Sequence, residues 1–162
     1  MAFDAFLKID GIDGESSDKT HKGEIEIDSF SWGNANAGSI GSGGGGGAGK
    51  VSFQDFHFSM PISKASPLLM KACATGQHFP TATLTCRKAG GSQVEFLKIK
   101  LADILVSSFQ NGGLGQGSDI KQDELPLDQL SLNFVKFDFL YTVDKTGETT
   151  QAAFDLRENK TD

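Results

Sequence analysis

The chain has 162 residues, of which 38% are hydrophobic and 22% charged, and its mean hydropathy is -0.24. This composition is typical of one folded domain spanning 1–162 and excludes a disordered chain. The formal net charge is -6 and the lysines and arginines are scattered, so there is no basic stripe that would bind nucleic acid.

Alternating apolar residues predict a mainly β chain. The first strand is expected from Phe3 to Ile9, and a polar loop rich in Gly, Asp and Ser follows at 11–24. Further strands are expected at 25–32, 51–60, 81–88, 93–110, 130–143 and 151–158.

The alternation changes phase inside several of these strands. Ile25 and Ile27 have one parity and Phe30 and Trp32 the other, so one extra residue near 28–29 would place all four side chains on one face. The same change occurs within 51–60, 93–110 and 130–143. Bulges of this kind bend a sheet into a closed barrel, and strands buried on both faces give the same pattern. Both interpretations stay open at this point.

One helix is predicted at 66–76, within SKASPLLMKACATGQHFP. Ser66 suits the N-cap, Pro67 suits the first helical position, and Gly76 can adopt the left-handed conformation that ends a helix. The side expected to pack on the sheet carries Leu69, Ala72 and Cys73.

The stretch GSIGSGGGGGAGKVSFQDF, residues 38–56, resembles a phosphate-binding loop in part. Gly44, Gly49 and Lys50 have the required spacing, but Val51 stands where a Ser or Thr must bind magnesium. A strand pattern follows, whereas a phosphate site requires the N-terminus of a helix. We therefore expect a loop that enters a strand and no nucleotide site.

No arrangement of titratable residues predicts catalysis, a cofactor or a metal. The histidines have no partner at ligand spacing, the cysteines form no C-x-x-C motif, and paired carboxylates are typical of a solvated acidic face. We expect buried, reduced thiols, although the sequence does not exclude a disulfide. The residues considered are His21, His57, His78, Cys73, Cys86, and the pairs Glu24 with Glu26 and Asp123 with Glu124.

Several stretches in a fixed order carry a family resemblance. They are FLKIDGIDGESSDKTHKGEIEI, SFSWG, GGGGGAGKVSFQDFHFSM, SKASPLLMKACATGQHFP, RKAGG followed by FLKIKL, and VSSFQNGG, over about residues 3–113, with a weaker match in LSLNFVKFDFLY. Together they resemble the Hcp family, the tube proteins of bacterial type VI secretion systems. The segments 113–128 and 143–162 are the least similar to the family, and no role is assigned to them.

This resemblance implies a small β-barrel of antiparallel strands, with one helix on its side and long Gly-rich loops. It implies homo-hexameric rings that stack into a tube, with the sheath, the spike and small effector proteins in the lumen as partners. A head-to-tail contact closes into a ring when the rotation permits. No nucleic acid, cofactor or membrane insertion is expected. The N-terminus lacks a signal-peptide pattern, so we expect synthesis in the cytoplasm and secretion without one.

The resemblance also assigns residues. Ser31 in SFSWG matches a family position that faces the lumen and touches cargo, and Trp32 beside it is expected in the core or in a subunit interface. The glycine run matches a protruding loop that reaches a neighbouring ring or subunit. The contacts assigned to this loop involve Gly41, Gly43, Gly44, Gly45, Gly46, Gly47 and Lys50.

Two other functions stay open from the sequence alone. A small β-barrel module that binds a sugar or lipid would need an aromatic cavity wall, which Phe56, Phe58 and Phe137 can provide. An enzyme with an anion site at the Gly-rich loop is the third possibility. The oligomeric state separates the tube subunit from both.

Overall fold

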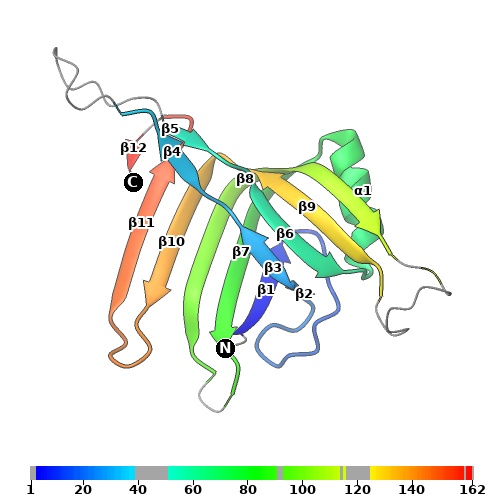
Figure 1. The fold of residues 1–162 in the computed structure, drawn as a ribbon, viewed down its shortest axis with the longest axis horizontal. Helices are drawn as coiled ribbons and strands as arrows, with labels where there is room; N and C mark the ends of the chain where they lie inside the picture. The colour runs from blue at the N-terminus through cyan, green and yellow to red at the C-terminus, as the bar shows by residue number, and fades with distance from the viewer. Residues whose placement is uncertain are drawn as a thin grey trace.

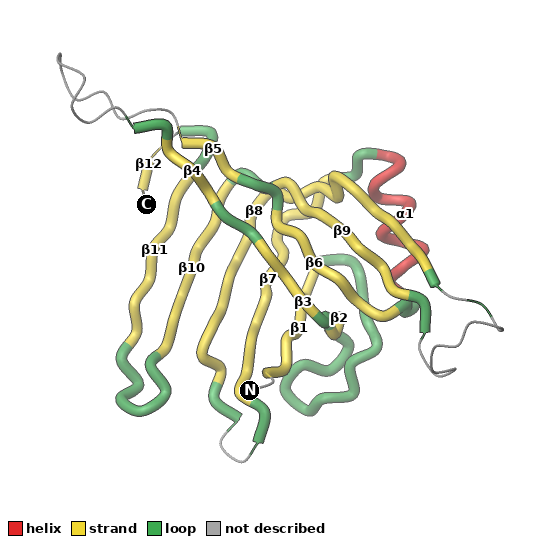
Figure 2. Tube along the Cα trace, in the orientation of Figure 1, coloured by secondary structure: helices red, strands yellow, loops and turns green. Residues whose placement is uncertain are grey.

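The computed structural model describes residues 3–38, 51–90, 93–113, 115, 125–158 and 160–161. These residues form antiparallel β-strands in a large and a small sheet, with an α-helix at one side (Figures 1 and 2). In chain order the elements are β1 (Phe3–Ile9), β2 (Ile25–Glu26), β3 (Ser29–Ser31), β4 (Asn34–Asn36), β5 (Val51–Phe53), β6 (Phe56–Pro61), α1 (Ala65–Thr75), β7 (His78–Lys88), β8 (Glu95–Gly112), β9 (Leu127–Asn133), β10 (Lys136–Thr142), β11 (Thr149–Asp155) and β12 (Lys160–Thr161).

The large sheet branches at β8, its longest strand. The first half of β8 lies between β7 and β10, in the order β12-β11-β10-β8-β7-β1-β2. The second half pairs with β9, which pairs with β6, which pairs with β3. In Figure 1 this second arm crosses in front of β7 and β1. The hydrophobic core contains residues of both arms, among them Leu7, Leu84, Phe56 and Leu132.

The prediction of a closed barrel is wrong for the described strands. β2 pairs with β1 and β3 pairs with β6, and no ladder in the described residues joins the two arms at this side. Between them the Ile27 amide donates to the Ala5 carbonyl at 3.1 Å, and the Asp28 amide donates to the Ser59 carbonyl at 2.8 Å. The chain therefore changes partner at residues 27–28, and the two arms are linked by the chain rather than by continuous pairing.

Each predicted phase change coincides with a break or a bulge. β5 and β6 are separated by residues 54–55, and β9 and β10 by residues 134–135. The β7–β8 register shifts between Cys86 and Arg87. β8 exchanges β10 for β9 at Asp103, whose φ of 52° is unusual for a residue other than glycine. The exchange at Asp103 was not predicted; the phase changes that were predicted mark breaks between strands and the irregularity beside Cys86 and Arg87.

The helix prediction is confirmed to within one residue, but the N-cap prediction is wrong. Lys64 occupies the N-cap without a side-chain bond, and Ser66 lies inside the helix, where its hydroxyl donates to Asp128 of β9. The Gly76 end is as predicted, with a φ of 68°. Leu69 and Ala72 are buried against the sheet and Cys73 is half-buried. Within the described part of the chain, no helix is both long and apolar enough to cross a membrane.

Candidate functional site

Ser31, the predicted lumen residue, is exposed on β3 and begins a row of polar side chains. It pairs with His57 of β6, His57 pairs with Ser131 of β9, and Ser131 pairs with Ser108 of β8. Directly paired residues project to the same side of a sheet. The four side chains therefore form one row across four strands.

A second row runs beside the first. Ser29 of β3 pairs with Ser59, Ser59 with Gln129, and Gln129 with Gln110. The hydroxyls of Ser29 and Ser59 are 2.5 Å apart and hydrogen-bonded. We call the two rows the polar face, which consists of Ser29, Ser31, His57, Ser59, Ser108, Gln110, Gln129 and Ser131.

The other side of the same strands is apolar. Phe30 pairs with Phe58, Phe58 with Leu130, and Leu130 with Phe109. Phe58 and Leu130 are buried in the core, and Phe30 and Phe109 are half-buried against it. This alternation is typical of an antiparallel sheet that covers a core with one face and leaves the other open. The polar side chains therefore point away from the core, and among them Ser131 is buried, 3% exposed, where its hydroxyl is bonded to Ser107 and Ser108.

The polar face borders a hollow of about 760 Å³. His57 is the one titratable residue among those that line it. Asp55 precedes His57 by two residues, and its two oxygens accept hydrogen bonds from Ser107 at 2.6 Å and Asn133 at 3.0 Å. The hollow therefore offers hydroxyl, amide and imidazole groups beside the half-buried Phe30 and Phe109.

Trp32 lies at the centre of an aromatic cluster that connects the two arms. Its ring packs edge-on to Phe137 with centroids 5.3 Å apart and stacks on Phe139 at 5.6 Å. It also contacts Phe56 and Phe134. Trp32 is half-buried against the core, which is one of the two positions expected for it; its expected subunit contact stays a prediction.

The same cluster counts against a sugar- or lipid-binding cavity. Phe56 and Phe58 are buried in the core, and Phe137 packs between Trp32, Phe53 and Phe154. Their faces are occupied by one another and by neighbouring side chains, so they do not form the open wall that such a ligand needs.

The residues assigned to the glycine loop, Gly41 to Gly47 and Lys50, lie outside the described residues, as do Asp123 and Glu124. The end of the loop sequence is described: Val51–Phe53 forms β5, which pairs with β4. A strand therefore follows the glycine run, as predicted, where a phosphate site would need a helix.

The remaining candidate residues do not assemble into a reactive site. Both thiols are free in this structure, and burial raises the pKa of the Cys86 thiol to about 11, which disfavours the reactive thiolate. Among the described residues, no group of three or more His, Cys, Asp or Glu could hold a metal ion. Glu26 is exposed, whereas Glu24 is bonded to His21.

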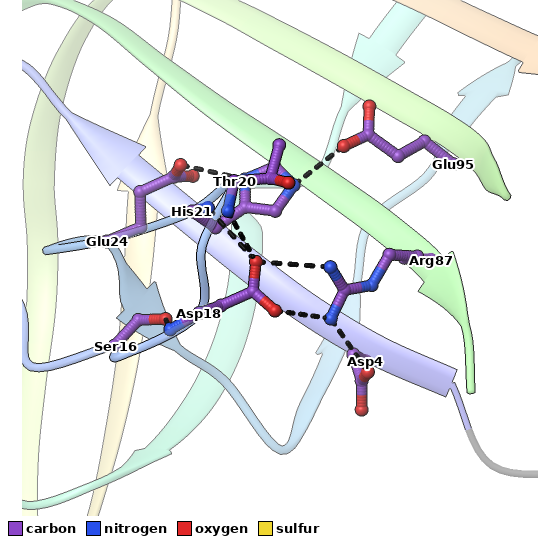
Figure 3. A network of polar contacts seen from close by, with 8 residues as sticks. All are labelled: Asp4, Ser16, Asp18, Thr20, His21, Glu24, Arg87 and Glu95. Atoms are coloured by element: carbon purple, nitrogen blue, oxygen red, sulfur yellow. Dashed lines mark hydrogen bonds and ion pairs between the residues drawn. The ribbon is translucent and has the colours of Figure 1, made fainter. Parts of the chain in front are cut away.

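A second polar cluster, which no sequence pattern indicated, joins loop 11–24 to the sheet (Figure 3). Arg87 of β7 binds Asp18 of the loop and Asp4 of β1. Arg87 is 69 residues from Asp18 in the chain. Only the pairing of β1 with β7 brings these groups together, so no local spacing could have predicted them.

Comparisons with known proteins place the chain in a family. The family model described as "Type VI secretion system effector, Hcp" matches residues 6–141. Protein hcp1 of Pseudomonas aeruginosa is 44% identical over an alignment of 165 positions, which covers 98% of each chain.

Solved structures agree with this match. Hcp1 from Salmonella typhimurium has 37% identity and a TM-score of 0.80, with all of both chains covered. Hcp2 from the same organism has 34% identity and a TM-score of 0.73 over 97% of this chain and 98% of the other. A type six secretion system protein has 30% identity and a TM-score of 0.86 over 99% of this chain and 100% of the other.

Proposed function

Because the chain belongs to the Hcp family of type VI secretion system proteins, we propose that six copies form a ring whose lumen is lined by the polar face. The rings stack into a tube that carries small effector proteins. The chain acts as one domain, 1–162, and as a structural subunit without catalysis or a cofactor.

The polar face supports this proposal because it lies on a sheet section with two open edges. Among the described strands, β3 pairs only with β6, and residues 106–112 of β8 pair only with β9. An open edge presents unpaired backbone groups to another chain. Neither edge carries a charged residue or a proline, the features that usually protect such edges.

Two different edges suit a ring. A contact between unlike surfaces of identical subunits closes when the rotation per subunit permits. Joining β3 of one copy to β8 of the next would continue the sheet and place every polar face on the same wall. The half-buried Phe30 and Phe109 would lie beside this junction, where apolar area is lost from water.

The remaining partners follow from the family. We assign ring-to-ring or subunit contacts to Gly41, Gly43, Gly44, Gly45, Gly46, Gly47, Lys50 and Trp32. The sheath and spike act on the assembled tube. By this proposal the protein is made in the cytoplasm and leaves through the secretion system.

The mass in solution and a lumen variant test this function. Light scattering on a sizing column should give one species near six protomers. Ser31→Gln should keep that mass and reduce co-purification of an effector of the same system, because the longer side chain alters the lumen wall. Ser17→Gln, in the exposed loop 11–24, is the matched control. A monomer at all concentrations would refute the ring, and equal effector retention by both variants would refute the lumen assignment.

A further inference from the structure

His21 connects loop 11–24 to two strands of the large sheet (Figure 3). Its Nδ1 lies 2.7 Å from Glu24 Oε2, and its Nε2 lies 2.7 Å from Glu95 Oε1 of β8. The imidazole also stacks on Phe6 of β1, with the ring centroids 4.5 Å apart and an angle of 10° between the planes. His21 is 6% exposed, so these contacts replace its hydration.

The two short contacts require one more proton than a neutral imidazole and two ionised carboxylates hold together. A neutral imidazole has one N–H and one lone pair, and a carboxylate only accepts. One carboxylate would therefore face a lone pair at 2.7 Å if the ring were neutral. Both contacts are hydrogen bonds when both ring nitrogens carry hydrogen, or when one of the carboxyl groups does.

We propose that this additional proton, shared by His21, Glu24 and Glu95, clamps loop 11–24 onto β1 and β8, and that its loss as the pH rises releases the loop. The closed loop holds the proton and the open loop does not, so closing is linked to proton uptake. The population of the closed form therefore increases as the pH falls, and the population of the open form increases as the pH rises.

The other charged groups beside His21 form a second anchor for the loop. Arg87 of β7 contacts Asp18 at 2.7 Å and 3.1 Å and Asp4 of β1 at 3.3 Å. The bond to Arg87 lowers the pKa of Asp18 to about 2. Asp18 Oδ1 also accepts from the amides of Thr20 and His21. The loop therefore has a permanent anchor at Asp18 and a proton-dependent anchor at His21.

Release of the anchor at His21 would alter one end of the molecule. Loop 11–24 lies at the same end of the strands as the β7–β8 and β10–β11 connections (Figure 1). It covers Phe6, which is 3% exposed under the His21 ring. If the proposed function holds, one ring meets the next at such an end, and the clamp would make stacking depend on pH. The clamp itself does not require a ring.

Trypsin cleavage measures the open loop directly, because Lys19 and Lys22 are exposed within it. The wild-type rate of cleavage there, corrected for the activity of trypsin on a small peptide, should rise about tenfold from pH 6.5 to pH 8.5, the ratio expected for the loss of one charge-assisted hydrogen bond. Cleavage after Lys145, in the β10–β11 turn, should change little and reports general loosening.

Glu95→Gln keeps a hydrogen bond to His21 Nε2 but removes the need for the additional proton. The glutamine amide can donate to Nε2 of a neutral ring while Nδ1–H donates to Glu24, so closure needs no additional proton. Cleavage of this variant should stay slow and nearly equal at the two pH values. Glu26→Gln removes an exposed carboxylate on β2 outside the cluster and should behave as wild type.

Equal cleavage of the wild type at both pH values would overturn the proposal, and so would a pH dependence of Glu95→Gln as steep as that of the wild type. Sedimentation of the same proteins measures their oligomeric state and so tests the ring independently of the clamp. A monomer with a pH-dependent loop would refute the ring and keep the clamp, whereas a stable ring with a pH-independent loop would refute the clamp alone.

Discussion

Asp18 is a single carboxylate that receives two bonds from a buried guanidinium and two from backbone amides. The bond to Arg87 is the main cause that lowers the pKa of Asp18 to about 2, against about 3.9 in an unfolded chain. The folded protein therefore binds fewer protons here than the unfolded chain as the pH falls from about 4 to about 2. The stability that Asp18 contributes is complete above the unfolded value and is lost through this interval.

We expect Asp18→Asn to be less stable than wild type by a constant amount from pH 5 to pH 8, and the difference to shrink as the pH falls from 4 towards 2. Urea midpoints at pH 7, 4, 3 and 2.5 measure it. Asp13→Asn, exposed in the same loop, is the control and should follow wild type throughout. A difference between wild type and Asp18→Asn that persists unchanged at pH 2.5 would contradict the ion pair.

Local rules for single residues predicted backbone conformation better than side-chain partners. Gly76 ends the helix as its type predicts, because the requirement for a positive φ is local. Ser66 is not the N-cap, because the helix begins one residue before it; its hydroxyl accepts from the Ser63 amide at 3.0 Å and donates to the buried Asp128, 62 residues away. Ser63 receives the Ala65 amide instead, at 3.2 Å. Partners brought by tertiary structure could not be predicted from sequence spacing.

At the scale of elements, sequence parity predicted where strands change direction or partner. The break at 134–135 lies where the apolar positions change phase, as predicted. The exchange of neighbours at Asp103 was not predicted and lies where the pairing with β10 ends. Parity does not specify which strand becomes the new partner. The closed barrel was therefore a wrong extrapolation from correctly predicted irregularities.

β11 allows a test of this pairing, because it is bonded to β10 on one side and its other side is open from Thr149 to Ala153 among the described strands. The Val143 amide donates to Glu148 and the Leu156 amide donates to Val135, both at 2.7 Å. Bonded pairs alternate along an antiparallel ladder. The amide of Ala152 therefore points to β10, and that of Gln151 points away.

We expect Gln151→Pro to match the stability of Gln151→Ala, because it removes only an outward amide. Ala152→Pro should lower the free energy of unfolding by about 1 kcal/mol or more, because a ladder bond is lost. The alanine control removes the 2.7 Å bond from Gln151 to Asp138 equally. Urea unfolding of the three variants decides the register, and equal losses at both proline positions would show that the assigned amide directions are wrong.

At the scale of the whole molecule, the family resemblance singled out Ser31, which is exposed on β3, but the other residues of the polar face were not predictable. Its residues come from β3, β6, β9 and β8, and no spacing in the sequence links Ser31 to Gln110. His57 was considered only as a metal ligand. Its position beside Ser31 depends on the register of two strands, which is set by core packing on the opposite face.

The open edges of β3 and β8 carry no charge, so a ring closed through them should resist salt. Backbone hydrogen bonds and apolar contacts are screened far less than exposed ion pairs, for which the Debye length falls from about 10 Å at 0.1 M to about 3 Å at 1 M salt. We expect the mass measured by light scattering to be the same at both salt concentrations.

Ser29→Lys, which puts a charge on the β3 edge, should shift the protein to smaller species, because edge lysines oppose strand pairing. Ser17→Lys adds the same charge in loop 11–24 and should leave the mass unchanged. Dissociation of wild type at 1 M salt would instead indicate that ion pairs hold the ring, and an intact ring in Ser29→Lys would show that β3 does not form the junction.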